Sequence, residues 1–339
     1  MMKNLKIGSV TLAHGLMLAP MAGVTDTSFR LLCRRAGAEY TVTEMVSAKA
    51  LCFEQRQRAG KPLRTAPIAA LTRDEGPCAV QLFGNEPDMM AEAARLLATG
   101  EYRGVGEVLP VAIDINMGCP VAKVVDNGEG SALMKNPTLA AEIVRAVKRA
   151  VDIPVTVKIR AGFTEATKNA PEFAARMEDA GADLICVHGR TRQQFYAPSS
   201  DNGIIAAVKR AVSVPVVGNG DLFSADDVVR MYEQTGCDGV SIARGAQGNP
   251  FIFSEIVARL EGREYTPPTP AERLDVALAH AADLAARKGE YVGLAEARKH
   301  MLWYCKGLRG ATAARVALTH ADTLEAIRAV FDELLKENI

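Results

Sequence analysis

No two cysteines of this sequence form a C-x-x-C pair, although the chain contains seven of them. They are odd in number and widely scattered, at positions 33, 52, 78, 119, 186, 237 and 305. This spacing disfavours a disulfide framework, a zinc site and an iron–sulfur cluster, which need paired or clustered thiols. We therefore expect no metal, and each thiol has to be interpreted on its own.

Long hydrophobic runs are also missing. No apolar stretch approaches the roughly 20 residues that a membrane-spanning helix needs. The N-terminal apolar stretch is interrupted by His14 and Gly15 and lacks a signal-peptide cleavage pattern. With 339 residues, of which 48% are hydrophobic, the chain can form one large core and a smaller appendage. These features predict a soluble, cytoplasmic protein with no membrane partner.

The chain has no net charge, because 40 Lys and Arg residues balance 40 Asp and Glu residues. Global charge therefore does not indicate a nucleic-acid partner. Basic residues are nevertheless concentrated in a first basic zone, from Lys3 to Arg64, and a second basic zone, from Arg287 to Arg315. Two such zones fit a polyanion that contacts both ends of the sequence, and they fit solvated helix faces about equally well.

Short apolar segments alternate with longer helical patterns over most of the chain. The strand candidates are residues 16–21, 40–45, 79–84, 111–116, 155–160, 184–189, 215–220 and 239–244. Between them lie segments such as "MMAEAARLLATG", whose apolar residues have the spacing of amphipathic helices. Eight such units over about 250 residues predict a closed (β/α)8 TIM barrel of the α/β class. A doubly wound sheet would instead have a G-x-G-x-x-G loop after its first strand, and here that strand ends in "APMAG".

The pattern changes after the eighth unit. The helical segment "FIFSEIVARLEG" is followed by the proline-rich "REYTPPTPAERL", which cannot continue a helix. Helical patterns then run through "RLDVALAHAADLAARKG", "LAEARKHMLWYCKGL" and "TLEAIRAVFDELLKEN". We therefore expect a barrel domain (residues 1–255), a linker (256–269) and a small C-terminal helical domain (270–339) that carries the second basic zone.

Polar residues and glycines follow most of the predicted strands, at the barrel end where enzymes with this fold carry out their chemistry. These strand-end residues are Pro20, Met21, Glu44, Gln81, Asn116, Cys119, Lys158, His188, Asn219, Gly220, Asp221, Arg244 and Gly245. One strand-end histidine by itself is more often a structural hydrogen-bonding residue than a catalyst. The whole set around one barrel mouth predicts a pocket for a polar, largely planar ligand.

The last two strand ends indicate a phosphate. Glycines and Arg244 follow these strands in "GNGD" and "ARGAQGNP", and a helix begins near Pro250. Backbone N–H groups with a guanidinium form a phosphate site at this position of many barrels. Glycines at strand ends are also ordinary turn formers, so each one alone is weak support.

Several segments, in order and at similar spacing, resemble the tRNA-dihydrouridine synthases. They are "APMAGVTDTSFR", "TEMVSA", "VQLFGNEP", "DINMGCPVAKVVDNGEGSALMKNP", "VTVKIRAGF", "VHGRTRQQFY", "VVGNGD" and "ARGAQGNPFIF". The resemblance covers residues 7–255 and continues more weakly into "ARKHMLWYCKG", and "QGNPFIF" is similar to the B-type bacterial members. It implies an enzyme with FMN that uses NADPH, or alternatively NADH, to reduce the C5=C6 bond of a D-loop uridine in tRNA. No obligatory protein partner is implied.

The resemblance also implies a role for each strand-end residue. Cofactor contacts would come from the flavin-ring residues Pro20, Met21, Gln81 and Lys158 and from the ribityl and phosphate residues Asn219, Gly220, Asp221, Arg244 and Gly245. Asn116 and His188 would contact the flavin or the flipped uracil, and Glu44 would lie on the substrate side. Arg298 and Lys299, in the second basic zone, would bind tRNA, whose uridine must be extruded to reach the barrel mouth.

Cys119 follows a predicted strand, between Gly118 and Pro120, and the resemblance implies that it is the catalytic acid. Hydride transfer from flavin N5 to C6 of uracil leaves C5 in need of a proton. A free thiol has a pKa near 8.5, so it is mostly protonated at neutral pH and can still release its proton. The alternative, a buried thiol that acts as a small hydrophobe, fits Cys186 and Cys237 better.

Two segments depart from the family pattern. After "RTRQQFY" the chain reads "APSSDNGII", with Pro198 and Asn202 where the family usually has glycine and tryptophan. This change leaves the assignments of flavin residues and Cys119 as they are, and it affects loop contacts to tRNA. The segment before the fourth predicted strand, residues 100–111 ("GEYRGVGEVLPV"), is longer than is usual in the family. The sequence gives no functional reason for its length.

Two other functions remain open from the residues alone. A small-molecule flavin reductase of the dihydroorotate type performs similar pyrimidine chemistry but does not need a basic helical domain. A non-catalytic RNA-binding barrel would not need Cys119, Lys158 and His188. Activity with free orotate and the flavin absorbance of the purified protein separate the three possibilities.

Overall fold

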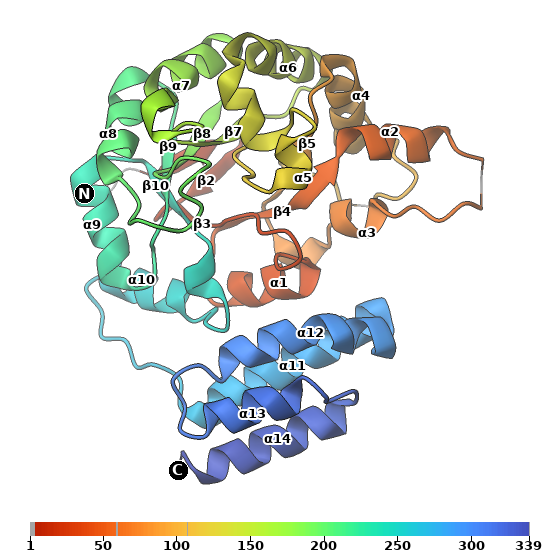
Figure 1. Ribbon diagram of the computed structural model, residues 1–339, viewed down its shortest axis with the longest axis vertical. Helices are drawn as coiled ribbons and strands as arrows, with labels where there is room; N and C mark the ends of the chain where they lie inside the picture. The colour runs from red at the N-terminus through yellow and green to blue at the C-terminus, as the bar shows by residue number, and fades with distance from the viewer. Residues whose placement is uncertain (1–3, 59, 107, 339) are drawn as a thin grey trace.

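The fold is seen in a computed structural model that describes residues 4–58, 60–106 and 108–338. Lys3, the first residue of the first basic zone, lies outside this range. Eight parallel strands close into a barrel in the order β10-β3-β4-β5-β6-β7-β8-β9, and helices surround it (Figure 1). This confirms the predicted (β/α)8 barrel.

All eight predicted strands form, with ends that differ by a few residues from the prediction. They are β3 (Leu16–Leu18), β4 (Tyr40–Ser47), β5 (Cys78–Phe83), β6 (Ala112–Met117), β7 (Val155–Arg160), β8 (Leu184–His188), β9 (Val216–Asn219) and β10 (Gly239–Ile242). The main barrel helices are α1 (Thr27–Arg35), α2 (Ala48–Arg56), α4 (Pro87–Ala98), α6 (Pro137–Ala150), α7 (Ala170–Asp179), α8 (Asn202–Ala211), α9 (Ala225–Thr235) and α10 (Ile252–Leu260). Shorter helical turns are α3 (Ala66–Ala69), α5 (Ala122–Val125), η1 (Arg73–Glu75), η2 (Gly130–Lys135), η3 (Glu165–Thr167) and η4 (Arg244–Ala246).

An N-terminal hairpin, which the sequence analysis missed, precedes the barrel. Its strands β1 (Leu5–Ile7) and β2 (Val10–Leu12) pair antiparallel to each other. Leu5, Ile7 and Leu12 are buried together with apolar side chains from the first residues of the barrel strands. The hairpin therefore covers the amino-terminal end of the barrel, and the opposite end is left for a site.

The strand β6 shows how the barrel interior changes from apolar to polar. Ile113, Ile115 and Met117 belong to the core between the strands and the surrounding helices. The alternate residues Ala112, Asp114 and Asn116 point the other way, into the barrel, because successive side chains of a strand lie on opposite faces. Ala112 belongs to the apolar cluster at the hairpin end. The polar members of the set therefore approach the carboxyl end, where the site lies.

Four helices follow the barrel: α11 (Pro270–Lys288), α12 (Glu290–Tyr304), α13 (Ala311–Leu318) and α14 (Leu324–Lys336). They have their own hydrophobic cluster. The sequence predicts helical segments corresponding to three of them but not α13, and the predicted linker boundary at residue 256 falls inside α10. Among the described residues, no helix has the length and apolar character needed to cross a membrane.

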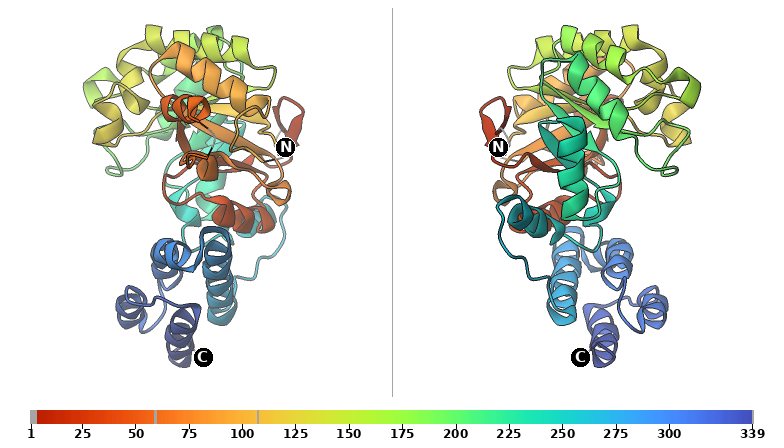
Figure 2. Two further views of the ribbon diagram at one scale, coloured as in Figure 1. Left: turned by 90° about the vertical axis from the view of Figure 1, so that its right-hand side faces the viewer. Right: turned by 90° about the vertical axis from the view of Figure 1, so that its left-hand side faces the viewer.

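The helical domain packs against the barrel next to α1 (Figures 1 and 2). The Phe29 ring of α1 lies 5.7 Å from the His280 ring and 5.5 Å from the His300 ring, measured between ring centroids. Lys288 Nζ, at the end of α11, is 3.4 Å from Oδ2 of Asp26, which caps α1. The start of α1 is therefore held by both domains, directly after the loop that follows β3.

Candidate active site

A cavity of about 500 Å³ opens at the carboxyl ends of the barrel strands. This volume lies within the roughly 300 to 1,000 Å³ of small-molecule sites. The cavity brings together most of the strand-end residues: Pro20, Met21, Gln81, Asn116, Cys119, Lys158, His188, Asn219, Gly220, Asp221, Arg244 and Gly245. It does not include Glu44, Arg298 or Lys299, which lie outside its lining.

Cys119 lies in a loop held by hydrogen bonds on both sides. Oδ1 of Asn116 accepts from the backbone N–H groups of Gly118 and Cys119, at 3.1 and 2.9 Å. The Cys119 carbonyl accepts from the Ser131 hydroxyl at 2.8 Å. Burial raises the pKa of the Cys119 thiol, against the opposing effect of the Arg160 charge. The other six cysteines are buried, so Cys119 is the thiol available to a ligand.

Arg160, which is not among the predicted site residues, also lines the cavity. Its Nε donates to the Gly118 carbonyl at 2.7 Å and its Nη1 to the Thr191 carbonyl at 3.0 Å. Burial lowers the pKa of Arg160 to about 10, so it remains cationic at neutral pH. Its position two residues after Lys158 places both side chains on the same face of β7, which is the signal that could have identified it.

Lys158 precedes Arg160 on β7 and is half-buried in the barrel. Its Nζ donates to Oδ1 of Asn219 at 3.0 Å, and Nδ2 of Asn219 donates to the Ser241 carbonyl at 2.5 Å. Burial lowers the pKa of Lys158, because a low-dielectric surrounding disfavours the ammonium form. An anion placed next to Lys158 would oppose this shift.

His188 is neutral at neutral pH. Burial and then the charge of Arg160 hold the pKa of His188 well below its usual range. Nη1 of Arg190 lies 3.4 Å from Nε2 of His188, and a guanidinium can only donate. Nε2 is therefore the acceptor and Nδ1 carries the proton.

Asp221 and Arg244 form the rim of the cavity beyond β9 and β10. Burial by itself would raise the pKa of the Asp221 carboxyl, but the hydrogen bond from Arg190 opposes this effect, and the pKa of Asp221 is lowered. The Asp221 carboxylate accepts from Arg190 at 2.5 Å and from Arg244 at 3.1 Å. The Arg244 guanidinium lies 4.3 Å from the centre of the Tyr196 ring and 5.4 Å from that of Phe223. Asp221 is thus neutralised by arginines, and Arg244 is held at the cavity mouth.

Two glycines allow the rim loops to pack closely. Gly220 has a φ of +126°, and a Cβ there would lie 2.2 Å from Oγ of Ser200. A Cβ on Gly245 would lie 2.0 Å from the Leu222 carbonyl oxygen. Only glycine fits at either position, so the two residues shape the cavity whatever they bind.

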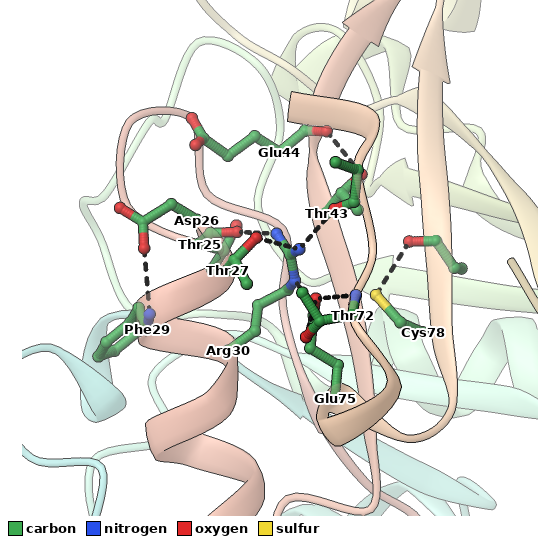
Figure 3. Close-up of polar contacts among 12 residues, drawn as sticks. Thr25, Asp26, Thr27, Phe29, Arg30, Thr43, Glu44, Thr72, Glu75 and Cys78 are labelled. Atoms are coloured by element: carbon green, nitrogen blue, oxygen red, sulfur yellow. Dashed lines mark hydrogen bonds and ion pairs between the residues drawn. The ribbon is translucent and has the colours of Figure 1, made fainter. Parts of the chain in front are cut away.

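Three predicted substrate residues lie outside the cavity. Glu44 accepts from the backbone N–H of Gly23, in the loop that follows β3, and Figure 3 shows its side chain beside the loop that leads into α1. Lys299 Nζ is 3.9 Å from the position that a Cβ would take on Gly23. Arg298 instead pairs with Asp322 within the helical domain. Lys299 therefore lies near the cavity rim, whereas Arg298 is held in an ion pair within the helical domain.

The loop that departs from the family pattern also borders the cavity. Arg190 Nε donates to the carbonyl of Pro198 at 2.5 Å, so this carbonyl takes part in fixing the rim. Asn202 begins α8 and donates to Gln234 at 2.7 Å, away from the cavity lining. Among the described residues, no cluster of three or more His, Cys, Asp or Glu side chains could hold a metal ion.

Sequence comparisons identify relatives of the whole chain. A family model described as dihydrouridine synthase matches residues 17–339. The chain is 43% identical over 306 residues to a probable tRNA-dihydrouridine synthase of Rickettsia conorii, covering 90% of this chain and 88% of that protein. It is 41% identical over 326 residues to tRNA-dihydrouridine synthase B of Pseudomonas aeruginosa, covering 96% and 94%. The resemblance found in the sequence is thereby confirmed.

Solved structures share the fold at low identity. The structure of a histamine dehydrogenase from Rhizobium sp. 4-9 superposes with a TM-score of 0.56 at 15% identity, covering 88% of this chain and 50% of that chain. The chain thus spans about half the length of that protein. At this identity the likeness supports the barrel fold alone.

Proposed function

This chain belongs to the dihydrouridine synthase family, and from this premise we propose that it reduces the C5=C6 bond of a D-loop uridine in tRNA, with FMN as its cofactor and NADPH as reductant. One observation supports this proposal most directly. Cys119 is a partly exposed thiol in a cavity whose charged lining residues are mostly cationic. Such a site offers a proton to a ring that gains negative charge during reduction.

The donor set of the cavity fits FMN. Among the described residues that line it, Asp221 is the only carboxylate, and Arg190, which pairs with it at 2.5 Å, balances its charge. Lys158, Arg160 and Arg244 then leave an excess of positive charge for a phosphate and for a flavin that becomes anionic on reduction. We assign the ring to the side of Pro20, Met21, Gln81 and Lys158, and the ribityl phosphate to Asn219, Gly220, Asp221, Arg244 and Gly245.

The chemistry divides between cofactor and protein. Bound FMN would supply the hydride that adds to C6 of the uracil. The Cys119 thiol would give the proton that C5 needs, and the resulting thiolate would regain a proton from water. Lys158 and Arg160 would stabilise negative charge that develops in the cavity, since both side chains are already fixed by hydrogen bonds. Neutral His188 offers its Nδ1–H to a carbonyl oxygen of the ligand.

The tRNA would lie across the cavity mouth and the helical domain. Lys288 and Lys299 adjoin the loop after β3, whose residues Pro20 and Met21 line the cavity. The extruded uridine would then enter the barrel while the RNA backbone rests on the second basic zone. NADPH as the reductant and a cytoplasmic location stay predictions.

Activity on a tRNA transcript tests this function. The purified protein with NADPH and unmodified tRNA should form dihydrouridine, measured by mass spectrometry of the nucleosides. Oxidation of NADPH with free orotate but not with tRNA would favour the small-molecule reductase. A colourless protein that binds tRNA and forms no dihydrouridine would favour the non-catalytic RNA-binding barrel.

Replacement of Arg244 tests the phosphate assignment. The purified protein should be yellow and release FMN and not FAD, and Arg244→Ala should weaken FMN retention about tenfold or more, because it removes a charge-assisted hydrogen bond. Retention through gel filtration is measured by absorbance. Arg259→Ala, which removes an arginine on the outer surface of α10, is the matched control. Equal retention in Arg244→Ala and the control would show that the phosphate lies elsewhere.

Replacement of residues in the second basic zone tests the tRNA surface. Lys299→Ala should raise the KM for tRNA and reduce the slope of its salt dependence by about 1, as expected for one lost phosphate contact. NADPH oxidation without tRNA should stay unchanged. Adding Arg298→Ala should change this result little, because Arg298 is paired with Asp322 within the helical domain. Lys336→Ala, at the end of α14, is the control, and tRNA kinetics of Lys299→Ala equal to those of this control would place the RNA elsewhere.

A further inference from the structure

A buried carboxylate lies in the barrel, below the cavity, where the proposed chemistry gives it no role. Asp114 is 4% exposed and belongs to β6, two residues before Asn116. Burial raises the pKa of Asp114 to about 6, which shows that the barrel interior disfavours its charge. Replacing such a group by an apolar one generally favours folding unless its hydrogen bonds are needed. Its partners therefore indicate what it does.

Asp114 begins a continuous series of hydrogen bonds that ends at the Cys119 loop. Its Oδ2 accepts from Nε2 of Gln81 at 2.6 Å, and Oε1 of Gln81 accepts from Nδ2 of Asn116 at 2.8 Å. Oδ1 of Asn116 accepts from the N–H groups of Gly118 and Cys119. The strand register places Gln81 directly opposite Asp114 on β5 and β6. We call this series, Asp114–Gln81–Asn116, the amide relay.

Both ends of the amide relay fix its direction. The backbone N–H groups at Gly118 and Cys119 can only donate, so Asn116 must turn its oxygen toward them and its NH2 group toward Gln81. Gln81 must then present its oxygen to Asn116 and its NH2 group to position 114. That position needs an acceptor, and the Asp114 carboxylate is one, with its other oxygen bonded to the Thr156 hydroxyl.

We propose that Asp114 is a positioning residue for the Cys119 loop: it fixes the direction of the Gln81 and Asn116 amides, and through them the backbone that carries the thiol. The consequence for catalysis rests on the function proposed for Cys119. A misplacement of about 1 Å at a reacting group lowers rates strongly, so a carboxylate two side chains away can matter to the reaction. Asp114 itself is not among the residues that line the cavity, and it reaches the Cys119 loop only through Gln81 and Asn116.

Asp114→Leu is the variant that tests the relay. It keeps a similar volume and removes the acceptor, so Gln81 loses the partner that orients it. We expect iodoacetamide to label Cys119 about three to ten times faster than in the wild type, the effect of roughly one lost hydrogen bond on local opening. The other six thiols are buried, so labelling of the native protein reports on Cys119. Hydrogen exchange of the peptide that contains Gly118 and Cys119 should accelerate in parallel.

Three further variants separate positioning from general loss of packing. Asp114→Asn keeps an acceptor toward Gln81, and it should restore labelling and exchange to within about twofold of the wild type. Tyr40→Phe removes a hydroxyl without a hydrogen-bond partner from the same barrel interior and should change neither rate. Gln81→Leu interrupts the relay at its middle, and its effect should not add to that of Asp114→Leu, since both act through Asn116.

The outcomes are distinguishable. Unchanged labelling and exchange in folded Asp114→Leu would overturn the proposal, and if that variant does not fold, unchanged rates in Gln81→Leu would overturn it. Equal acceleration in Tyr40→Phe would also overturn it, because the effect would then come from the barrel interior in general. Uridine reduction in Asp114→Leu should fall about tenfold with the KM for tRNA unchanged. If the wild type reduces no uridine, the proposed function fails, while labelling and exchange still decide the role of Asp114.

Discussion

A Cys119→Ala variant should retain its flavin and its reduction by NADPH, yet lose about 10² to 10⁴ in the rate at which tRNA reoxidises it, the range typical of a removed general acid. In the proposed mechanism the thiol takes no part in flavin reduction, whereas reduction of the uracil ring cannot be completed without a proton at C5. Stopped-flow absorbance measures the two half-reactions separately. The Cys119 side chain lines the cavity and the loop around it is held by backbone contacts, so the substitution should leave the fold intact.

Two companion variants make this result specific. Cys119→Ser should recover only part of the rate, because a hydroxyl is a much weaker acid than a thiol. Lys158→Ala should slow flavin reduction as well, since the Lys158 ammonium in the cavity would stabilise the negative charge that forms in that half-reaction. If Cys119→Ala slowed flavin reduction and spared reoxidation by tRNA, the thiol would not be the proton donor.

The barrel could be predicted from the sequence because its strands and helices repeat a simple pattern. Segments such as Val155–Arg160 combine apolar and β-branched residues over the length of a strand, and amphipathic helices separate them. The hairpin β1–β2 was missed because two strands of three residues are too short to show alternation. The helix α13 was missed because only two of its eight residues, Val316 and Leu318, are apolar and larger than alanine, which is too few to show a helical period.

The cavity residues could be predicted because they follow the strands directly, where a barrel places its ligands. Arg160 and Asp114 were missed for one reason: both point into the barrel from within a strand, two residues from a residue that was recognised. Strand alternation applied to Lys158 and Asn116 would have suggested them. The pairing of Arg298 with Asp322 could not be predicted, because it joins residues of different segments of the helical domain.

The loop that carries Pro20 and Met21 is followed by a buried ion pair, which the sequence does not reveal. Arg30 of α1 is 1% exposed and Glu75 of η1 is fully buried, and Nε of Arg30 lies 2.5 Å from Oε2 of Glu75 (Figure 3). Nη1 of Arg30 also donates to the Thr25 carbonyl at 2.7 Å. This pair therefore ties the segment before α1 to the segment before β5.

Arg30→Met should lower the free energy of unfolding by about 3–5 kcal/mol, because it leaves the Glu75 carboxylate buried without its cation. Replacing both residues, Arg30→Met with Glu75→Leu, should recover part of this loss, since no unpaired charge remains. The recovery is incomplete because Glu75 also accepts from the Thr72 backbone N–H at 2.8 Å. Urea denaturation followed by circular dichroism gives the free energy of unfolding of the wild type, of Arg30→Met and of the double variant.

An exposed ion pair provides the control for this prediction. Lys49 and Glu86 are 2.7 Å apart, close to the Arg30–Glu75 distance, but their side chains are 54% and 48% exposed. Lys49→Met should therefore change the unfolding midpoint little, because water and salt replace the lost partner. The difference between the two pairs lies in burial and not in contact distance. A loss in Arg30→Met as small as that in Lys49→Met would show that the buried carboxylate finds another partner, and that Arg30 is not what holds α1 to the segment before β5.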